Sequence, residues 1–170
     1  MIRSFLLISL IAILTSGCWP SSVSFMDTGS MPEEWKTFTV KTLDINSATA
    51  PASYASNLTE AIKDGVQNNT RLLLNPKSEG EVNIEGVINQ YSVAPIALQP
   101  GDVAAKNRLT VGVSFTIFIT QPTEDKMELR LSKFMDFDSN QDISGIENSL
   151  LEEINAQIVQ DVISKILSNW

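Results

Sequence analysis

Oxygen-bearing side chains recur at regular spacing in residues 136–147, whose sequence is DFDSNQDISGIE. Asp136, Asp138, Asn140 and Asp142 take the first, third, fifth and seventh positions of this stretch, and Glu147 takes the twelfth. This spacing is close to that of a calcium loop, in which carboxylate and amide oxygens converge on a hard cation. The chemistry predicted from these residues is therefore reversible binding of Ca²⁺.

Three features favour a different interpretation of the same stretch. The sixth position is Gln141, where calcium loops use glycine for a sharp turn, and the residues before Asp136 alternate like a strand instead of an entering helix. Ser144 and Glu147 also have the spacing of a capping box at the start of a helix. We favour a metal-free turn rich in Asp and Asn between a strand and a helix, with the calcium loop as the alternative.

Basic side chains concentrate at Lys106, Arg108, Arg130 and Lys133, in a chain whose formal net charge is −8. They lie in or next to two predicted strands that follow each other, so we expect them near one another. A cationic patch of this kind would bind the phosphate groups of an anionic lipid, the arginines through two parallel hydrogen bonds. Ordinary solvated strand ends are the alternative, and the pattern by itself favours that alternative.

Several side chains that are common in catalytic sites are missing or rare, because the chain has no histidine and one cysteine, Cys18. Ser-His-Asp and Cys-His nucleophilic sites and zinc sites built from Cys and His are therefore excluded. A carboxylate enzyme, such as a glycosidase using Asp136, Asp138 or Glu147, is the remaining enzymatic hypothesis, but no cleft residues are evident around that turn. We expect no enzymatic activity, and the acidic composition without a basic stripe argues against nucleic-acid binding.

The start of the chain has the layout of a secretory signal peptide over residues 1–17: Arg3, then the apolar run FLLISLIAIL, then small residues. The run is too short to cross a bilayer, which takes about 20 apolar residues. LTSGC at residues 14–18 resembles the lipobox of bacterial lipoproteins, although Thr15 stands where leucine is commonest. That resemblance implies cleavage before Cys18 and acylation of its thiol, and two or more acyl chains anchor a protein stably.

The segment after the lipobox predicts the organisation of the mature chain. We expect residues 18–30 to form a flexible lipidated tether and residues 31–170 a single domain. Trp19 replaces the aspartate that retains some lipoproteins in the inner membrane, which predicts the periplasmic side of the outer membrane. An intermolecular disulfide is the alternative use of the lone cysteine.

Hydrophobic periodicity predicts the elements that position these residues. Strands are predicted at 35–45, 71–74, 81–93, 108–121 and 127–137, and helices at about 53–69 and 145–168. The clearest strand is 108–121, where apolar and polar side chains alternate strictly, so one of its faces packs on a core. The order predicts an α+β two-layer sandwich, with two helices on one face of a mostly antiparallel sheet of about four to five strands.

The predicted mature chain resembles the LptE family of lipopolysaccharide-assembly lipoproteins, in a short and divergent form. The resemblance is carried by EWKTFTV, NLTEAIKDGVQNNTRLLL, GEVNIEGVINQYSVAPIAL, KNRLTVGVSFTI and the region from FMDFDSNQDISGIE to the final SNW. It implies an outer-membrane lipoprotein that plugs the lumen of the LptD barrel, helps that barrel fold, binds lipopolysaccharide and assists its delivery to the outer leaflet. No ligand residue is carried over, because the basic residues above align with no family binding motif. An accessory lipoprotein of another envelope transport or secretion complex is the alternative function.

Overall fold

A computed structural model of the protein describes residues 31–96 and 106–167. The predicted signal peptide and tether, with Cys18, lie outside the described residues. Along the chain the elements are β1 (Thr37–Val40), β2 (Asp44–Ile45), α2 (Tyr54–Asn69), β3 (Leu73–Leu74), β4 (Val82–Ile96), β5 (Lys106–Ile119), β6 (Asp125–Asp138) and α3 (Ile143–Leu167). Both predicted helices are therefore confirmed to within about two residues at each end.

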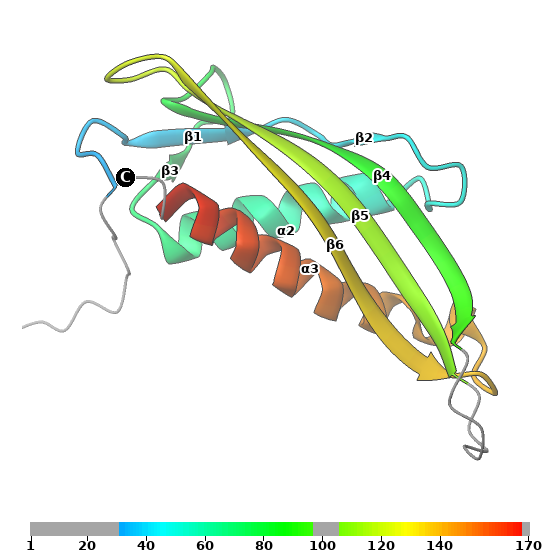
Figure 1. Ribbon diagram of the computed structural model, residues 1–170. Helices are drawn as coiled ribbons and strands as arrows, with labels where there is room; N and C mark the ends of the chain where they lie inside the picture. The colour runs from blue at the N-terminus through cyan, green and yellow to red at the C-terminus, as the bar shows by residue number, and fades with distance from the viewer. Residues whose placement is uncertain (1–30, 97–105, 168–170) are drawn as a thin grey trace, which may run out of the picture.

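The strands form one six-stranded sheet with the order β3-β1-β4-β5-β6, and β2 lies beside β4 off that path. The long strands pair antiparallel, β4 with β5 and β5 with β6. β1 pairs parallel with β3 and β4, and β2 pairs parallel with β4. The predicted α+β fold, with two helices on one face of the sheet, is confirmed (Figure 1). The parallel pairs are a feature that periodicity did not predict.

The predicted strand at 35–45 is interrupted in the middle. β1 ends at Val40 and β2 begins at Asp44. Between them Leu43 is buried, and its N–H donates to the hydroxyl of Thr59 on α2 at 3.1 Å. A backbone donor that a helix side chain satisfies does not take part in the sheet ladder, and alternation along the sequence carries no information about such a partner.

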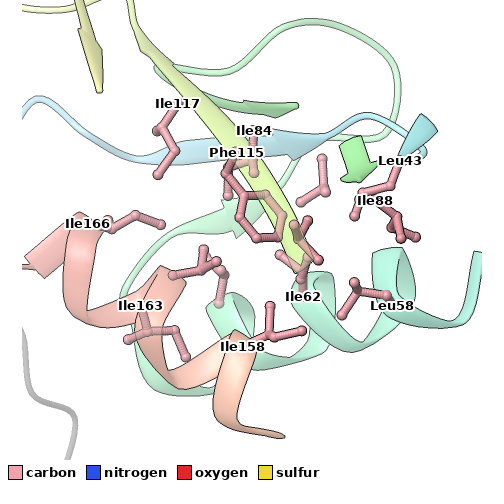
Figure 2. Close-up of a cluster of buried hydrophobic side chains, with 14 of the residues drawn as sticks. Leu43, Leu58, Ile62, Ile84, Ile88, Phe115, Ile117, Ile158, Ile163 and Ile166 are labelled. Atoms are coloured by element: carbon pink, nitrogen blue, oxygen red, sulfur yellow. The ribbon is translucent and has the colours of Figure 1, made fainter. Parts of the chain in front are cut away.

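The core fills the space between the two helices and one face of the sheet. In β5 the odd-numbered residues from Leu109 to Ile119 are buried, as the strict alternation predicts. Phe115 of β5 points toward Ile62 of α2 and Ile158 of α3 (Figure 2). The buried stripe of α3 comprises Leu150, Leu151, Ile154, Ile158, Val162, Ile163 and Ile166. The apolar sides of both helices therefore pack against this one face of the sheet.

The opposite side of the sheet, here called the outer face, consists of the even-numbered side chains of β5 and β6 and the β4 side chains registered with them. None of the helices in the described residues covers it (Figure 1). No helix within 31–96 or 106–167 combines the length and apolar character that crossing a membrane demands.

Candidate functional site

The stretch that matches a calcium loop crosses from the end of β6 into the first turn of α3. Asp138 ends β6, and the N–H of Gln141 donates to its carbonyl at 3.0 Å. Asp142 immediately precedes α3, and its Oδ1 accepts from the N–H of Ser144 at 3.1 Å. Asp142 therefore caps the helix. The predicted capping box is wrong, because Ser144 lies inside α3 and is the donor in this bond.

Glu147 contacts the core side of the sheet instead of the turn. The hydroxyl of Tyr91, a buried residue of β4, donates to Glu147 Oε1. The ring of Tyr91 meets that of Tyr54 edge-on with centroids 5.8 Å apart, and the Tyr54 hydroxyl donates to Asn155 Oδ1 at 2.8 Å. Burial raises the pKa of both tyrosines, so both hydroxyls stay protonated donors at neutral pH. These bonds tie α2 and β4 to α3.

The five residues predicted as calcium ligands are not brought together. Asp136 lies on the outer face, where it accepts two hydrogen bonds from Arg108, whereas Glu147 lies on the helix side of the sheet. Among the described residues, no three His, Cys, Asp or Glu side chains group so as to hold a metal ion. Calcium binding stays a prediction, and amide resonances of 136–147 that do not move in millimolar calcium would exclude it.

The four basic residues lie on neighbouring strands, as predicted, but in three places. Lys106 and Arg108 share one end of the outer face. Arg130 pairs with Ser114 of β5, six residues beyond Arg108, so Arg130 lies about 20 Å from Arg108. Lys133 projects from the opposite side of the sheet, where its Nζ lies 2.6 Å from Asp161 Oδ2 of α3. The structure therefore does not assemble these residues into one patch.

Arg108 is already engaged within the protein. Its Nε and one terminal nitrogen lie 2.6 and 2.9 Å from the two carboxylate oxygens of Asp136, and the guanidinium lies 3.7 Å from the ring centroid of Phe134. This arrangement combines a bidentate ion pair with a cation–π contact. A lipid phosphate would have to displace Asp136 before it could occupy the guanidinium fork.

Exposed aromatic side chains on the outer face are the feature that sequence reasoning missed. Phe118 on β5 is 38% exposed and Phe134 on β6 is 48% exposed. A surface hollow of about 650 Å³ lies beside Phe118, with Asn83 and Glu85 among its lining residues. The clue in the sequence was a bulky aromatic at each of two solvent-facing positions of alternating strands, where polar side chains are the rule.

Comparison with known proteins places this domain in a family. A family model described as LptE, lipopolysaccharide-assembly, matches residues 39–166, which run from β1 to the last turn of α3 and cover more than half of the chain. The chain belongs to the LptE family. No curated protein matches it.

Several solved structures share the fold of this LptE-family chain. A minor lipoprotein from Acinetobacter baumannii has 16% identity and a TM-score of 0.53, over 79% of this chain and 94% of that one. An uncharacterized lipoprotein B from Nitrosomonas europaea has 14% identity and a TM-score of 0.54, over 88% and 92% of the two chains. The hypothetical protein CT253 from Chlamydia trachomatis has 9% identity and a TM-score of 0.53, over 79% and 99%. At these identities the likeness shows the fold alone.

Membership of LptE supports a lipopolysaccharide-assembly lipoprotein, in a family that is not enzymatic. The expectation that this chain is no enzyme agrees with that family. Two of the three carboxylates named above for glycoside hydrolysis have other partners: Asp136 accepts from Arg108, and Glu147 accepts from Tyr91. The candidate functional site of this LptE domain is accordingly taken to be its outer face.

The titration of Asp136 is expected to depend on Arg108. The hydrogen bond from Arg108 lowers the pKa of Asp136, so the pair stabilises the fold above the unfolded-state pKa and loses that effect as pH falls through the folded-state pKa. Arg108→Gln is expected to raise the pKa of Asp136 toward its ordinary value, as followed by carboxyl ¹³C shifts against pH. Lys126→Gln, which removes a partner of Glu128 instead, is the control. The same Asp136 pKa with and without Arg108 would contradict the pairing.

Proposed function

We propose that this LptE-family chain plugs the lumen of the outer-membrane barrel LptD, helps that barrel assemble, and assists transport of lipopolysaccharide to the outer leaflet. The observation that carries the proposal is the family match over residues 39–166. A covalent lipid on Cys18 holds the domain at the periplasmic side of the outer membrane, where two or more acyl chains give stable attachment.

The architecture supports a plug on physical grounds. The lumen of an outer-membrane barrel is lined by polar side chains, so a protein that sits inside it needs a compact core and a polar exterior. Here the apolar sides of α2 and α3 are covered by the sheet, and the uncovered outer face carries hydroxyls, amides and paired charges. This combination suits a polar lumen better than it suits hydrocarbon.

Co-purification from a strain depleted of the native protein tests the proposal. A tagged chain supplied in trans is expected to recover LptD in detergent at near-equal stoichiometry and to restore lipopolysaccharide at the cell surface. Normal lipopolysaccharide export in the depleted strain, together with a tagged chain that recovers no LptD, would overturn the proposed function.

Replacing Cys18 with serine tests the anchor separately. Cys18→Ser, made behind a secretory signal peptide that is cut without acylation, removes the thiol that would carry the acyl chains, so the mature domain is expected to move from the membrane fraction to the soluble periplasmic fraction in cells without free LptD. Far-ultraviolet circular dichroism of the purified domain should be unchanged, since Cys18 precedes the described fold. The parent chain, with its own residues 1–17 and Cys18, is the control. A Cys18→Ser protein that stays in the membrane under these conditions contradicts lipid anchoring.

A further inference from the structure

The outer face is convex. In Figure 1 the long strands β4, β5 and β6 bend over the helices, so the side that carries α2 and α3 is concave and the outer face bulges away from them. Strands of 14 or 15 residues make this face about 45 Å long, and the three strands together with β1 make it about 15 Å wide. These dimensions are on the scale of a protein–protein interface, which covers about 800 Å² per partner.

Polar groups dominate the outer face, and its charges are locally balanced. Hydroxyl and amide side chains recur across the registered strands at Asn83, Ser92, Thr110, Ser114, Thr116 and Ser132. Lys41 lies 3.6 Å from Glu85, and Lys126 lies 3.1 Å from Glu128. With the Arg108–Asp136 pair, these contacts leave a face that is polar without a strong field of either sign.

Three exposed apolar side chains lie on the same face. The large hydrophobic residues exposed in the described part of the chain are Leu73, Val93, Phe118 and Phe134. Val93 is registered with the buried Leu109, so it lies on the helix side of the sheet. Phe118 and Phe134 lie on the outer face. Leu73 lies on this face too, because it is registered with Thr37, and Thr37 projects to the side opposite its buried neighbour Phe38. Phe134 pairs with Thr110, eight residues before Phe118, which places the aromatics about 26 Å apart. Aromatic side chains are enriched in protein interfaces, where a few residues carry most of the binding energy.

We propose that the convex outer face is the surface that docks against the inner wall of the barrel, with Phe118 and Phe134 as its anchors. This inference rests on the proposed function and adds the orientation of the plug. The wall of a barrel is concave from inside and carries polar side chains at alternate strand positions, which matches the shape and the balanced polarity of this face. The hollow beside Phe118 accepts a side chain from that wall.

The helix side offers the matched control surface. A hollow of about 530 Å³ lies between α2 and α3, lined by Asn57, Glu152 and Asn155 among other residues. It resembles the outer-face hollow in size but carries no exposed aromatic among the described large hydrophobics. A plug oriented by its outer face leaves this hollow away from the contacted wall.

Site-specific crosslinking in cells tests the orientation. A photoreactive phenylalanine at Thr110 or Thr116 on the outer face is expected to crosslink to LptD, at peptides whose attached residues alternate along barrel strands because only every second side chain faces the lumen. The same probe at Asn57 or Glu152 should give little LptD adduct. Adducts mainly from the helix side, or from the outer face to a second copy of this chain or to lipopolysaccharide, would overturn the inference.

Anchor variants give an independent readout. Phe118→Thr combined with Phe134→Thr is expected to reduce recovery of LptD by at least about tenfold, since two truncated anchors remove apolar contact at the interface. Threonine suits exposed strand positions, so the Tm of the free domain should stay near that of the parent. Asn57→Ala with Glu152→Ala is the control and should recover LptD normally. If the parent chain recovers no LptD, the proposed function fails; if the parent recovers LptD and the double threonine variant does too, only the orientation fails.

Discussion

Replacing Trp35 with alanine is expected to lower the free energy of unfolding by about 3–5 kcal/mol, the range for deletion of a buried aromatic side chain. Trp35 is 0% exposed, and its indole Nε1 donates to the carbonyl of Gln121 at 2.7 Å. It thereby joins the segment before β1 to the connection between β5 and β6. Alanine removes the packing and this hydrogen bond together, and urea unfolding of the purified domain measures the loss.

A tryptophan-to-phenylalanine change separates the two contributions. Trp35→Phe keeps most of the apolar area and removes the donor to Gln121, so we expect a loss of about 1–2 kcal/mol. A Trp35→Ala domain that unfolds at nearly the parent urea concentration would contradict the assigned burial. Both variants should show the parental slope of free energy against urea, because the surface exposed on unfolding is nearly the same.

Replacing Gly65 with leucine is expected to destabilise the domain by about 3 kcal/mol, at the upper end for overpacking. An ideal Cβ at Gly65 would lie 2.1 Å from Val159 Cγ1 on the facing helix, and 3.7 Å from Ile163 Cδ1. Glycine in a helix costs up to about 1 kcal/mol relative to alanine, so close packing of α2 on α3 explains its presence here. Thermal unfolding measures the effect, and the expected fall in Tm is roughly 10 °C.

The contact with Val159 can be isolated by a double-mutant cycle. Gly65→Ala and Val159→Ala are expected to be less destabilising together than the sum of the single changes, by about 1 kcal/mol or more, because Val159→Ala removes the atom that the new Cβ would meet. Gly145→Ala is the matched control, since its Cβ would have nothing within 4 Å, and it should be neutral or slightly stabilising. Strict additivity between Gly65 and Val159 would contradict the close helix approach.

The buried faces of the strands and helices, which local periodicity predicts, were confirmed. A strand side chain points to one face or the other every second residue, so the alternation in β5 identified its buried residues from Leu109 to Ile119 without knowledge of its neighbours. A helix presents one face every three or four residues, which identified Tyr54, Leu58, Ile62 and Val66 of α2. The outer-face aromatics Phe118 and Phe134 were in the same patterns, at positions that a search for core residues passes over.

The candidate site was harder to predict, because its residues contact partners in segments that are distant in the sequence. Glu147 fits a calcium loop and a capping box by spacing, yet its carboxylate accepts from Tyr91, 56 residues away. Lys133 and Arg130 are three residues apart, an odd spacing that places them on opposite sides of β6, but the partner of Lys133 is Asp161 on α3, which tertiary structure alone decides. Arg108 and Asp136 form a pair only because β5 and β6 align in this register.

The amino-acid sequence by itself determined the alternation of apolar and polar residues in the strands, the apolar stripes of the helices, and the position of the lone cysteine after an apolar run, because these are properties of neighbouring residues. Its composition also determined the absence of histidine. Tertiary structure alone decided the parallel pairing of β1 with β3 and β4, the partners of the acidic turn, and the convex face that carries the aromatics. Those features depend on which distant segments pack together, and the free energy of that packing is shared over the whole core instead of being encoded at any one position.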